Sequence, residues 1–554
     1  MTLGQDYGSR DTVIAETSRE ELSEKKEGAG VPSNHHHPSS SPSRTLRDES
    51  NLVTWDGPDD PDNPHNWSMA YRWWATLLCA VMTLNVTFAS SASSPGTTAI
   101  SEEFSVSEEV TDLTTSLFLV GLALGPILWG PGSEVLGRRL MYTISLSLYT
   151  IFHLGQALAP NIQTLLITRF FTSFCGSAPL TLGGGLMADL WGNPIRRGEA
   201  GTVFIGMIFL GPAIGPLVGG FIIDSGLGWR WLFWVMMIFA GVVTAFAIFC
   251  MPETYAPVLL LRKAQRLRKE DPIGNKDIFA ESERHHEPFS TIVYKTLYRP
   301  FQLLLNEPIL VLITIYISVV YGILYSLFET FPIIFIKHYD FTVSQSGLIF
   351  IGIMIGVLFA GVVNVVTMRP YPEAIIYWRG FPPPEMRLYG AMIAGPCLVV
   401  GTFFMGWTSQ YAGPVPWYVP ALSTPFIGTG VTLIFMSFMN YLVDTYAHYA
   451  ASAFAANVIV RCLFAAAFPL FTNQMYTSLG LNWGSTLIGC FSLLLCPIPF
   501  FFHKYGARIR QRSKFAPCKA STTHRSSDEL PADFGACSGS SSSKTNSIRR
   551  EGGG

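Results

Sequence analysis

The stretch GPGSEVLGRR, at residues 130–139, lies between two apolar runs, 112–131 and 140–158. Each run approaches the ~20 apolar residues that a helix needs to cross the ~30 Å hydrocarbon core of a bilayer. The glycines of the connecting stretch permit a tight turn and a close approach of helices. Glu134 and the two arginines can form charge-assisted hydrogen bonds that tie helix ends together. The stretch therefore predicts a short, rigid junction between two membrane helices.

Apolar runs of this kind recur along most of the chain. The 554 residues are 49% hydrophobic and only 14% charged, with a mean hydropathy of +0.32, whereas soluble domains usually carry about 25% charged residues. The runs predict an all-α membrane protein with twelve transmembrane helices. We expect the spans at 72–92, 112–131, 140–158, 164–188, 201–222, 230–250, 308–332, 345–366, 388–407, 416–439, 447–470 and 483–502.

The basic residues of the loops predict the orientation, because Lys and Arg accumulate on the cytoplasmic side of a membrane. With the N-terminus inside, the cytoplasmic loops contain the arginine pair 138–139 and a basic cluster at 262–299. The outside loops contain little more than Arg230 and Lys337, and the first of them is acidic at 102–112. Both termini are therefore predicted to be cytoplasmic, as an even number of spans requires.

A long polar stretch in the middle of the chain separates six spans from six others. Two bundles joined by a long cytoplasmic loop are how rocking transporters are built. Around 262–268 this stretch predicts a basic amphipathic helix at the membrane surface. We expect five parts: a disordered cytoplasmic N-terminal tail at 1–70, a six-helix bundle at 71–250, a cytoplasmic central loop at 251–307, a second six-helix bundle at 308–503 and a cytoplasmic tail at 504–554.

Two local patterns carry a family resemblance. The stretch 130–139 resembles motif A of the major facilitator superfamily (MFS), with Glu134 where most members have Asp. The stretch GPAIGPLVGG at 211–220, in the fifth span, resembles motif C of the drug:proton antiporter branch. Its small residues let that span pack closely against a neighbour, and its prolines offer a bend. The resemblance implies a gating role for Gly130, Glu134, Gly137, Arg138 and Arg139, and an antiporter signature at Gly211, Pro212, Gly215, Pro216, Gly219 and Gly220.

Two further stretches narrow the resemblance. In the fourth span, the segment from Arg169 to Asp189 resembles motif B, with Ser173 where the family usually has Gly. The segment WDGPDDPDNPHNWS at 55–68 resembles the juxtamembrane segment of fungal twelve-span drug:proton antiporters, of the polyamine, fluconazole-resistance and cercosporin-exporter types. The resemblance covers about residues 54–505 and implies the MFS fold and proton-coupled export.

Ionisable residues inside spans are costly and usually functional. Glu329 is the first candidate for carrying the proton, because a carboxyl group in a low-dielectric cavity exchanges protons when its access changes. The alternative is a wetted Glu near the outer end of the seventh span. For Arg169 the resemblance implies a role in proton coupling, and the alternative is a structural link to backbone carbonyls.

Acidic residues at the cytoplasmic ends of spans are candidates for an inside gate. Asp189 is the third candidate for proton coupling, and we also expect it to pair with Arg138 or Arg139. Asp444 is expected to do the same in the second half. Either arrangement would tie cytoplasmic helix ends by a charge-assisted hydrogen bond.

Several polar and aromatic residues of the second half are candidates for lining a substrate cavity. Two tyrosines recur at helical spacing on the seventh span, and two amides lie in later spans. Arg461 lies in the middle of the eleventh span, where it either pairs with Glu329 or lines the cavity. The candidates are Tyr321, Tyr325, Asn440, Asn457 and Arg461.

Other chemistries have no pattern in the sequence. The chain contains no GxxxxGK[ST] phosphate loop, no HExxH motif and no GxSxG nucleophile elbow. Most of its nine cysteines fall in apolar runs without metal-ligand spacing. We therefore expect no catalytic residue, no cofactor and no metal. The net charge of −2 gives no reason to expect a nucleic-acid partner.

The sequence thus predicts a multi-pass transporter of the plasma membrane, acting as a monomer in the lipid bilayer. It would export a small organic compound in exchange for protons by alternating access. A drug, a toxin, a polyamine or a secondary metabolite would all fit. The main alternative is a proton symporter or facilitator that imports a nutrient. A membrane enzyme or a transporter-like receptor belongs to a different class, and no catalytic pattern or long signalling tail supports either.

Overall fold

The computed structural model describes residues 51–284, 294, 298–378, 382–411, 413–446, 449–513 and 515. The predicted disorder of 1–50 and most of the C-terminal tail lie outside these residues. Within them the regular structure is helical, apart from one isolated bridge between Leu52 and Phe279. Ten helices of the described residues are long and apolar enough to cross a membrane, by length and composition. The all-α membrane class is therefore confirmed, although this count is not twelve.

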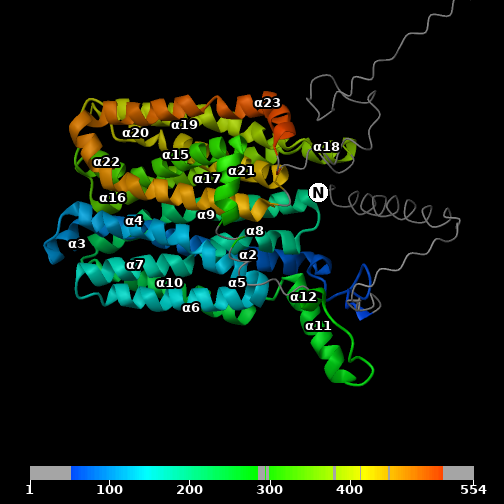
Figure 1. The fold of residues 1–554 in the computed structure, drawn as a ribbon. Helices are drawn as coiled ribbons and strands as arrows, with labels where there is room; N and C mark the ends of the chain where they lie inside the picture. The colour runs from blue at the N-terminus through cyan, green and yellow to red at the C-terminus, as the bar shows by residue number, and fades with distance from the viewer. Residues whose placement is uncertain are drawn as a thin grey trace, which may run out of the picture. The chain divides into compact units, whose positions relative to one another are not determined.

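The helices form two groups that follow each other along the chain (Figure 1). The first group contains α2 (Met69–Ser91), α3 (Thr97–Phe104), α4 (Glu108–Leu124), α5 (Pro126–Leu136), α6 (Arg138–Ala157), α7 (Ile162–Gly176), α8 (Ala178–Leu190), α9 (Pro194–Asp224) and α10 (Arg230–Cys250). The second contains α15 (Pro308–Phe331), α16 (Val343–Leu348), α17 (Phe350–Thr367), α18 (Tyr371–Tyr377), α19 (Tyr389–Ser409), α20 (Tyr418–Ala421), α21 (Thr424–Thr445), α22 (Ala450–Leu495) and α23 (Ile498–Arg512).

Shorter elements connect these helices. Between the two groups lie α11 (Ala256–Glu270), α12 (Glu281–Arg284) and α14 (Arg299–Asn306). The remaining short helices are η3 (Pro64–Asn66), η4 (Ser94–Gly96), η6 (Pro332–Ile336) and η7 (Pro384–Leu388). The basic helix predicted around 262–268 is present as α11.

Local sequence explains where several helices begin and break. The side chain of Asn193 accepts a hydrogen bond from the backbone N–H of Ile195 at the start of α9, and Pro194 follows at the first helical position. Two predicted spans each consist of two consecutive helices, α4 with α5 and α7 with α8. At Pro332 α15 ends and a π-helical turn follows.

Packing is closest within each group, and α4 and α9 also pack on helices of the second group. In the first group α2 packs on α9, α4 on α7 and α6 on α10. In the second group α15 packs on α22, while α17 and α19 both pack on α21. Across the groups α4 packs on α22, and α9 packs on α16 and α17. The interface between the groups is therefore built mainly from the second and fifth predicted spans of one group against the eleventh and eighth of the other.

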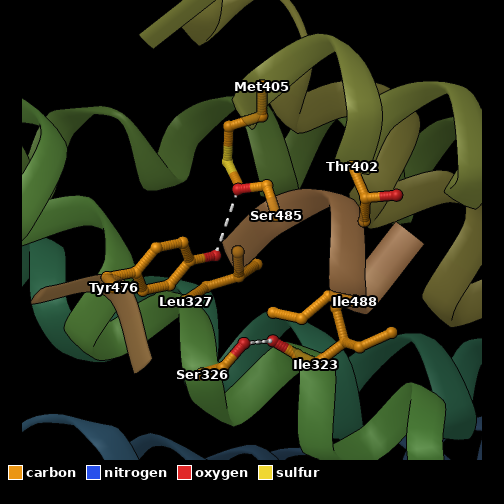
Figure 2. A pocket seen from close by; sticks show the side chains of 8 residues that line it. All are labelled: Ile323, Ser326, Leu327, Thr402, Met405, Tyr476, Ser485 and Ile488. Atoms are coloured by element: carbon orange, nitrogen blue, oxygen red, sulfur yellow. Dashed lines mark hydrogen bonds between the residues drawn. The ribbon is translucent and has the colours of Figure 1, made fainter. Parts of the chain in front are cut away.

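The helix α22 changes direction near its middle. Gly480 has non-helical backbone angles, φ 79° and ψ 166°, which favour glycine. The hydroxyl groups of Tyr476 and Ser485 lie 3.2 Å apart across this bend. They border a cavity of about 10 Å³ between α15, α19 and α22 (Figure 2), which has room for about one water molecule. None of the predicted substrate-cavity residues lines it.

Residues 52–62, which belong to the predicted N-terminal tail, pack on the central loop. The backbone N–H of Val53 donates to the carbonyl of Phe279, and Val53 packs with Ala264 of α11. The Lys263 ammonium lies 3.3 Å from the buried carboxylate of Asp60. The backbone N–H groups of Asp56 and Asp62 donate to that carboxylate and hold its pKa below the usual range. Residues 52–62 are thus attached to the central loop rather than free.

Candidate functional site

The stretch 130–139, which resembles motif A, joins α5 to α6 and carries a compact cluster of charges. Gly137 adopts φ +92°, and a Cβ atom there would approach the Cδ atom of Glu253 to 2.9 Å. Only glycine fits both this backbone conformation and this close contact. The Arg138 side chain turns toward α8, where its Nε lies 3.1 Å from the Asp189 carboxylate. The predicted ion pair of Asp189 is therefore present, and its partner is Arg138.

Sequence reasoning missed Glu253, which lies directly after α10 and is buried. Its carboxylate accepts hydrogen bonds from the backbone N–H groups of Arg138 and Arg139 at 2.9 and 3.3 Å. A carboxylate at a helix N-terminus satisfies N–H groups that have no partner within the helix, and it faces the positive end of the helix dipole. Glu253 thus joins the end of α10 to the start of α6. The Pro-Glu-Thr triplet after the sixth apolar run was the available signal.

Glu134 does not form the expected charge-assisted hydrogen bonds that would tie helix ends together. Its side chain is exposed and forms no hydrogen bond or ion pair with any described residue. The two carboxylates that bind the arginine side chain and the helix start come instead from Asp189 and Glu253. Arg139 is also exposed and donates to the backbone carbonyl of Ile248. The reason is that Glu134 lies on the exposed face of the last turn of α5.

The second group carries a matching set of charges. Nε of Arg387, in η7, lies 2.8 Å from the Asp444 carboxylate at the end of α21, so the pairing expected for Asp444 is present with Arg387. Nearby, the buried Arg510 of α23 binds Glu385 through two nitrogens at 3.0 and 2.7 Å. In each group, an ion pair therefore joins the start of the third span to the end of the fourth. A second contact, through Glu253 or Glu385, joins the start of the third span to the end of the sixth.

The glycines and prolines of 211–220 pack α9 against α2. At Gly215 a Cβ atom would lie 2.9 Å from the backbone nitrogen of Ala92 and 3.0 Å from the carbonyl of Phe88. Pro216 has no N–H, so the carbonyl of Pro212 lacks its helical partner. The Ser91 hydroxyl donates to that carbonyl at 3.0 Å. The close packing predicted for the fifth span is therefore present, and α2 is the neighbour.

The opposite side of the same helix meets the second group. At Gly220 a Cβ atom would lie 2.8 Å from the carbonyl of Val343, in α16. At the end of α9 the Asp224 carboxylate accepts from the backbone N–H of Ser344 at 2.8 Å. Near its start, Thr202 accepts from the Asn364 amide of α17 at 2.8 Å. The helix α9 therefore touches the second group near both of its ends.

Arg169 is held by the backbone of its own helix group. Its side chain is fully buried and donates to the carbonyls of Thr114 and Ala89 at 3.2 and 3.0 Å, and to the hydroxyl of Ser93 at 2.8 Å. The ring of Phe118 lies 4.6 Å from its guanidinium carbon. These contacts are those of the structural alternative, a link between α2, α4 and α7.

Glu329 lies near the end of α15 and is half-buried, with no hydrogen bond or ion pair to any described residue. Its carboxyl group is close enough to that of Asp112 for the two to repel each other. We expected Asp112 in an acidic outside loop, but it lies on α4 and is 5% exposed. Two carboxyl groups, one from each helix group, therefore lie close enough for their charges to interact, and the charge of Lys337 also acts on Glu329.

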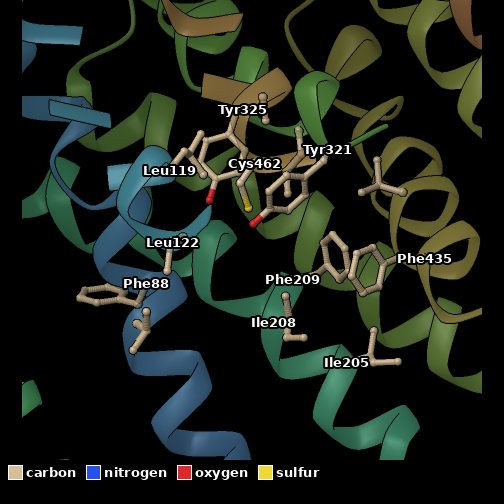
Figure 3. Packing of buried hydrophobic residues seen from close by; sticks show 14 of the residues in the cluster. Phe88, Leu119, Leu122, Ile205, Ile208, Phe209, Tyr321, Tyr325, Phe435 and Cys462 are labelled. Atoms are coloured by element: carbon tan, nitrogen blue, oxygen red, sulfur yellow. The ribbon is translucent and has the colours of Figure 1, made fainter. Parts of the chain in front are cut away.

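Tyr321, Tyr325 and Arg461 gather between the two groups. The guanidinium carbon of Arg461 lies 5.1 Å from the ring centroid of Tyr321 and 4.6 Å from that of Phe435. The Tyr325 hydroxyl donates to Ser90 of α2 at 2.9 Å. Figure 3 shows the two tyrosines beside Cys462, with the rings of Phe209 and Phe435 against each other. Arg461 does not pair with Glu329, which removes one of the two alternatives left open for it.

The two candidate amides occupy different places. Asn457 lies one turn before Arg461 on α22, is fully buried and donates to Thr314 at 3.3 Å. Asn440 is half-buried on α21, one turn before Asp444 and therefore on the same helix face. The spacing places it near the ion pair at the end of α21, away from the face of Phe435. The structure brings together Tyr321, Tyr325, Asn457 and Arg461, but not Asn440.

Comparison with known protein families shows which family the chain belongs to. The family model of the Major Facilitator Superfamily matches residues 78–469. The chain belongs to the Major Facilitator Superfamily. It is therefore a multi-pass membrane transporter rather than an enzyme, and proteins of this superfamily carry small molecules across a membrane. The resemblance inferred from motifs A, B and C is confirmed.

Fungal transporters are among its relatives. The citrinin biosynthesis cluster MFS transporter mrr1 of Monascus ruber is 41% identical over 468 residues, covering 84% of this chain and 92% of that protein. The Major facilitator superfamily multidrug transporter FLU1 of Candida albicans is 38% identical over 473 residues, covering 84% of this chain and 76% of that protein. The relatives of this MFS chain thus include transporters of metabolite clusters and of multidrug efflux.

The fold is also similar to solved structures. The proton:xylose symporter XylE, solved with 6-bromo-6-deoxy-D-glucose, matches with a TM-score of 0.56 at 17% sequence identity, over 79% of this chain and 96% of that one. At this level of identity the likeness concerns the fold alone, and it identifies the helix arrangement described above as the MFS fold.

Proposed function

We propose that this protein is a proton-coupled MFS efflux transporter of the plasma membrane that exports a small organic compound by alternating access. The observation that carries the proposal is the likeness, over 84% of the chain, to fungal transporters named for a metabolite cluster and for multidrug transport. A secondary metabolite, a toxin or a drug is the compound class that these names favour. We further propose that the protein acts as a monomer.

Twelve spans and two cytoplasmic termini are part of the proposal. In the described part of the chain, ten helices are long and apolar enough to cross a membrane. The helix α6 adds an eleventh, because its 20 residues are long enough to span although two arginines open it. Division of the longest candidate at Gly480 adds a twelfth. The loop charges then place the termini inside, and the parts 71–250 and 308–503 act as two bundles joined by the cytoplasmic loop 251–307.

We propose that Glu329 carries the proton and that Asp112 tunes it. Two carboxyl groups whose charges repel each other, and that form no ion pair with a described residue, cannot both stay ionised at low cost in a poorly solvated place. Separation of α4 from α15 during transport would relieve their repulsion and change the affinity for the proton. Arg169 holds three helices together in this scheme, and Asp189 serves the inside gate through Arg138 rather than carrying the proton.

The test uses the full chain in proteoliposomes with an imposed proton gradient. The exported compound is first found by scoring a deletion strain on a panel of drugs, polyamines and the host's own metabolites. Glu329→Gln keeps the size of the side chain but removes its titration, so we expect proton-driven transport to fall at least about tenfold, the order of effect that proton-transfer groups supply. Exchange of the compound between the two sides without a gradient should persist.

A matched control is Glu102→Gln, which changes an exposed carboxylate on α3. Its proton-driven transport should match that of the unmodified protein. Normal proton-driven transport by Glu329→Gln would falsify the assignment of the proton to Glu329. Reversal of the gradient separates export from import, because an antiporter accumulates the compound on the side from which protons leave, whereas a symporter accumulates it on the side that protons enter.

A further inference from the structure

Arg461 is a buried cation without an acidic partner among the described residues. The residue is 4% exposed, and its buried Nε–H donates to no acceptor. The side chain forms no ion pair with any acidic residue that the structure describes. Its surroundings are instead the ring faces of Tyr321 and Phe435. A guanidinium stays charged in proteins, so this charge cannot be removed by loss of a proton.

The comparison with Arg169 shows that this situation is not forced by burial alone. Arg169 is buried at least as deeply, yet its nitrogens donate to two carbonyls and a hydroxyl. Two contacts with aromatic rings compensate a guanidinium far less than hydrogen bonds to an anion do. Neither arginine has an anion among the described residues, but the donors of Arg169 are bonded, whereas the buried Nε–H of Arg461 has no acceptor.

A second unsatisfied group lies one turn away on the same face of α22. Asn457 is fully buried, and its amide donates to Thr314 while its Oδ1 has no partner. Residues four apart on a helix place their Cβ atoms about 5–6 Å apart. A cation that needs an anion thus lies beside an acceptor that needs a donor.

The surroundings of Arg461 reach the interface between the two helix groups, which alternating access must open. Phe435, under the guanidinium, packs edge-to-face on Phe209 of the first group with ring centroids 4.9 Å apart. Tyr321 packs on Tyr325, whose hydroxyl reaches the first group through Ser90. Figure 3 shows how these rings line one region between the groups. In transporters built from two repeats the substrate binds at such an interface.

Resting on the proposed function, we propose that the exported compound is an organic anion. A carboxylate or an acidic phenolate binds the guanidinium of Arg461, and a neighbouring hydroxyl donates to Asn457. An aromatic or flat apolar body lies against Tyr321 and Phe435. The same charge disfavours polyamines, because a cation would meet Arg461 without an intervening anion.

The experiment measures binding by the full chain purified in detergent, without any gradient. The probes are matched acids and amides: salicylate against salicylamide, and 3-hydroxy-2-naphthoate against its amide. We expect at least one acid to bind about tenfold or more tightly than its amide, as the stronger hydrogen bonds of a charged pair imply. Arg461→Gln should abolish this preference, and Arg461→Lys should keep part of it.

Two further variants locate the effect. Asn457→Leu should remove the advantage of 3-hydroxybenzoate over benzoate, which lacks the hydroxyl. Arg508→Gln removes the same charge from an exposed position on α23 and should leave every affinity unchanged. Because the first comparison uses the unmodified protein, it decides the matter even where Arg461→Gln does not fold.

The inference is overturned if no acid binds better than its amide, or if Arg461→Gln keeps the full preference. It fails independently of the proposed function. A protein that prefers acids but shows no proton-driven transport rejects the coupling and keeps the anion site. A protein that is driven by protons but prefers the amides keeps the coupling and rejects the anion site.

Discussion

At the scale of single residues, Arg169, Arg461 and Glu253 show that the type of a buried charged side chain does not fix what it contacts. The sequence places Arg169 and Arg461 alike, each inside an apolar run. Their environments differ because the carbonyls that bind Arg169 come from residues 55 and 80 positions away in the chain. Glu253 likewise acts on a helix start more than a hundred positions earlier. Residue type predicted that these positions matter, but not what each one contacts.

A substitution at Gly137 tests the junction between α5 and α6. Gly137→Ala adds a Cβ atom where the backbone is left-handed and where Glu253 already lies. We expect the free energy of unfolding to fall by about 1–3 kcal/mol, the usual range for such strain. Thermal unfolding of the purified protein, followed by tryptophan fluorescence, measures the change.

The control for this substitution is Gly184→Ala on α8, where nothing lies within 4 Å of an added Cβ atom. An alanine there should leave stability unchanged or raise it by up to about 1 kcal/mol, since alanine favours helix. Equal melting temperatures for Gly137→Ala and the unmodified protein would contradict the account of the junction.

At the scale of elements, α9 is the helix whose sequence and packing agree best. The small-residue spacing predicted a close neighbour for the fifth span, and α2 and α16 lie on two of its sides. The spacing carried no information about which helices these are, because any backbone fits against a glycine face. The divided helices α4–α5 and α7–α8 were not expected, since each apolar run is continuous in the sequence across the break.

A substitution at Gly215 tests this packing. Gly215→Ala places a methyl group against the backbone of Ala92 and Phe88 in α2. Overpacking of this kind costs about 1–3 kcal/mol, and separation of α9 from α2 should also impair transport. Melting temperature and uptake into proteoliposomes report the two effects.

Gly201→Ala lies on the same helix, where an added Cβ atom meets nothing within 4 Å. It should change neither melting temperature nor transport noticeably. If Gly215→Ala behaved in the same way, close contact between α9 and α2 would not be needed for either property.

At the scale of the whole molecule, α9 touches the second group near both ends, through Asn364 to Thr202 and through Ser344 to Asp224. Alternating access requires one of these ends to separate while the other stays closed. The structure therefore has both ends of this interface in contact. The charge of Arg461, which no described anion balances, lies at the interface between the groups, and the interacting carboxyl groups of Asp112 and Glu329 come one from each group.

Crosslinking tests whether this interface opens. In a background without native cysteines, Thr202→Cys with Asn364→Cys should react with a short bifunctional thiol reagent, because the two native side chains are in hydrogen-bond contact. We expect the crosslink to stop transport almost completely and a cleavable reagent to restore it on reduction. Each single cysteine variant, treated in the same way, should keep its transport. Unchanged transport after complete crosslinking would rule out opening at this end.

The sequence by itself determined the membrane class, the family and the helices that carry its motifs, because hydropathy and glycine spacing are local properties of the chain. It also predicted the ion pairs of Asp189 and Asp444, since charges at neighbouring span ends have few other partners. Only the tertiary structure decided which buried charge is satisfied. It showed that Glu253, and not Glu134, binds the helix start at motif A, and that the charges of Asp112 and Glu329 interact. It also left Arg461 without an anion. These outcomes depend on contacts between segments far apart in the chain, and the cost of an unpaired charge is set by those contacts rather than by the residue type.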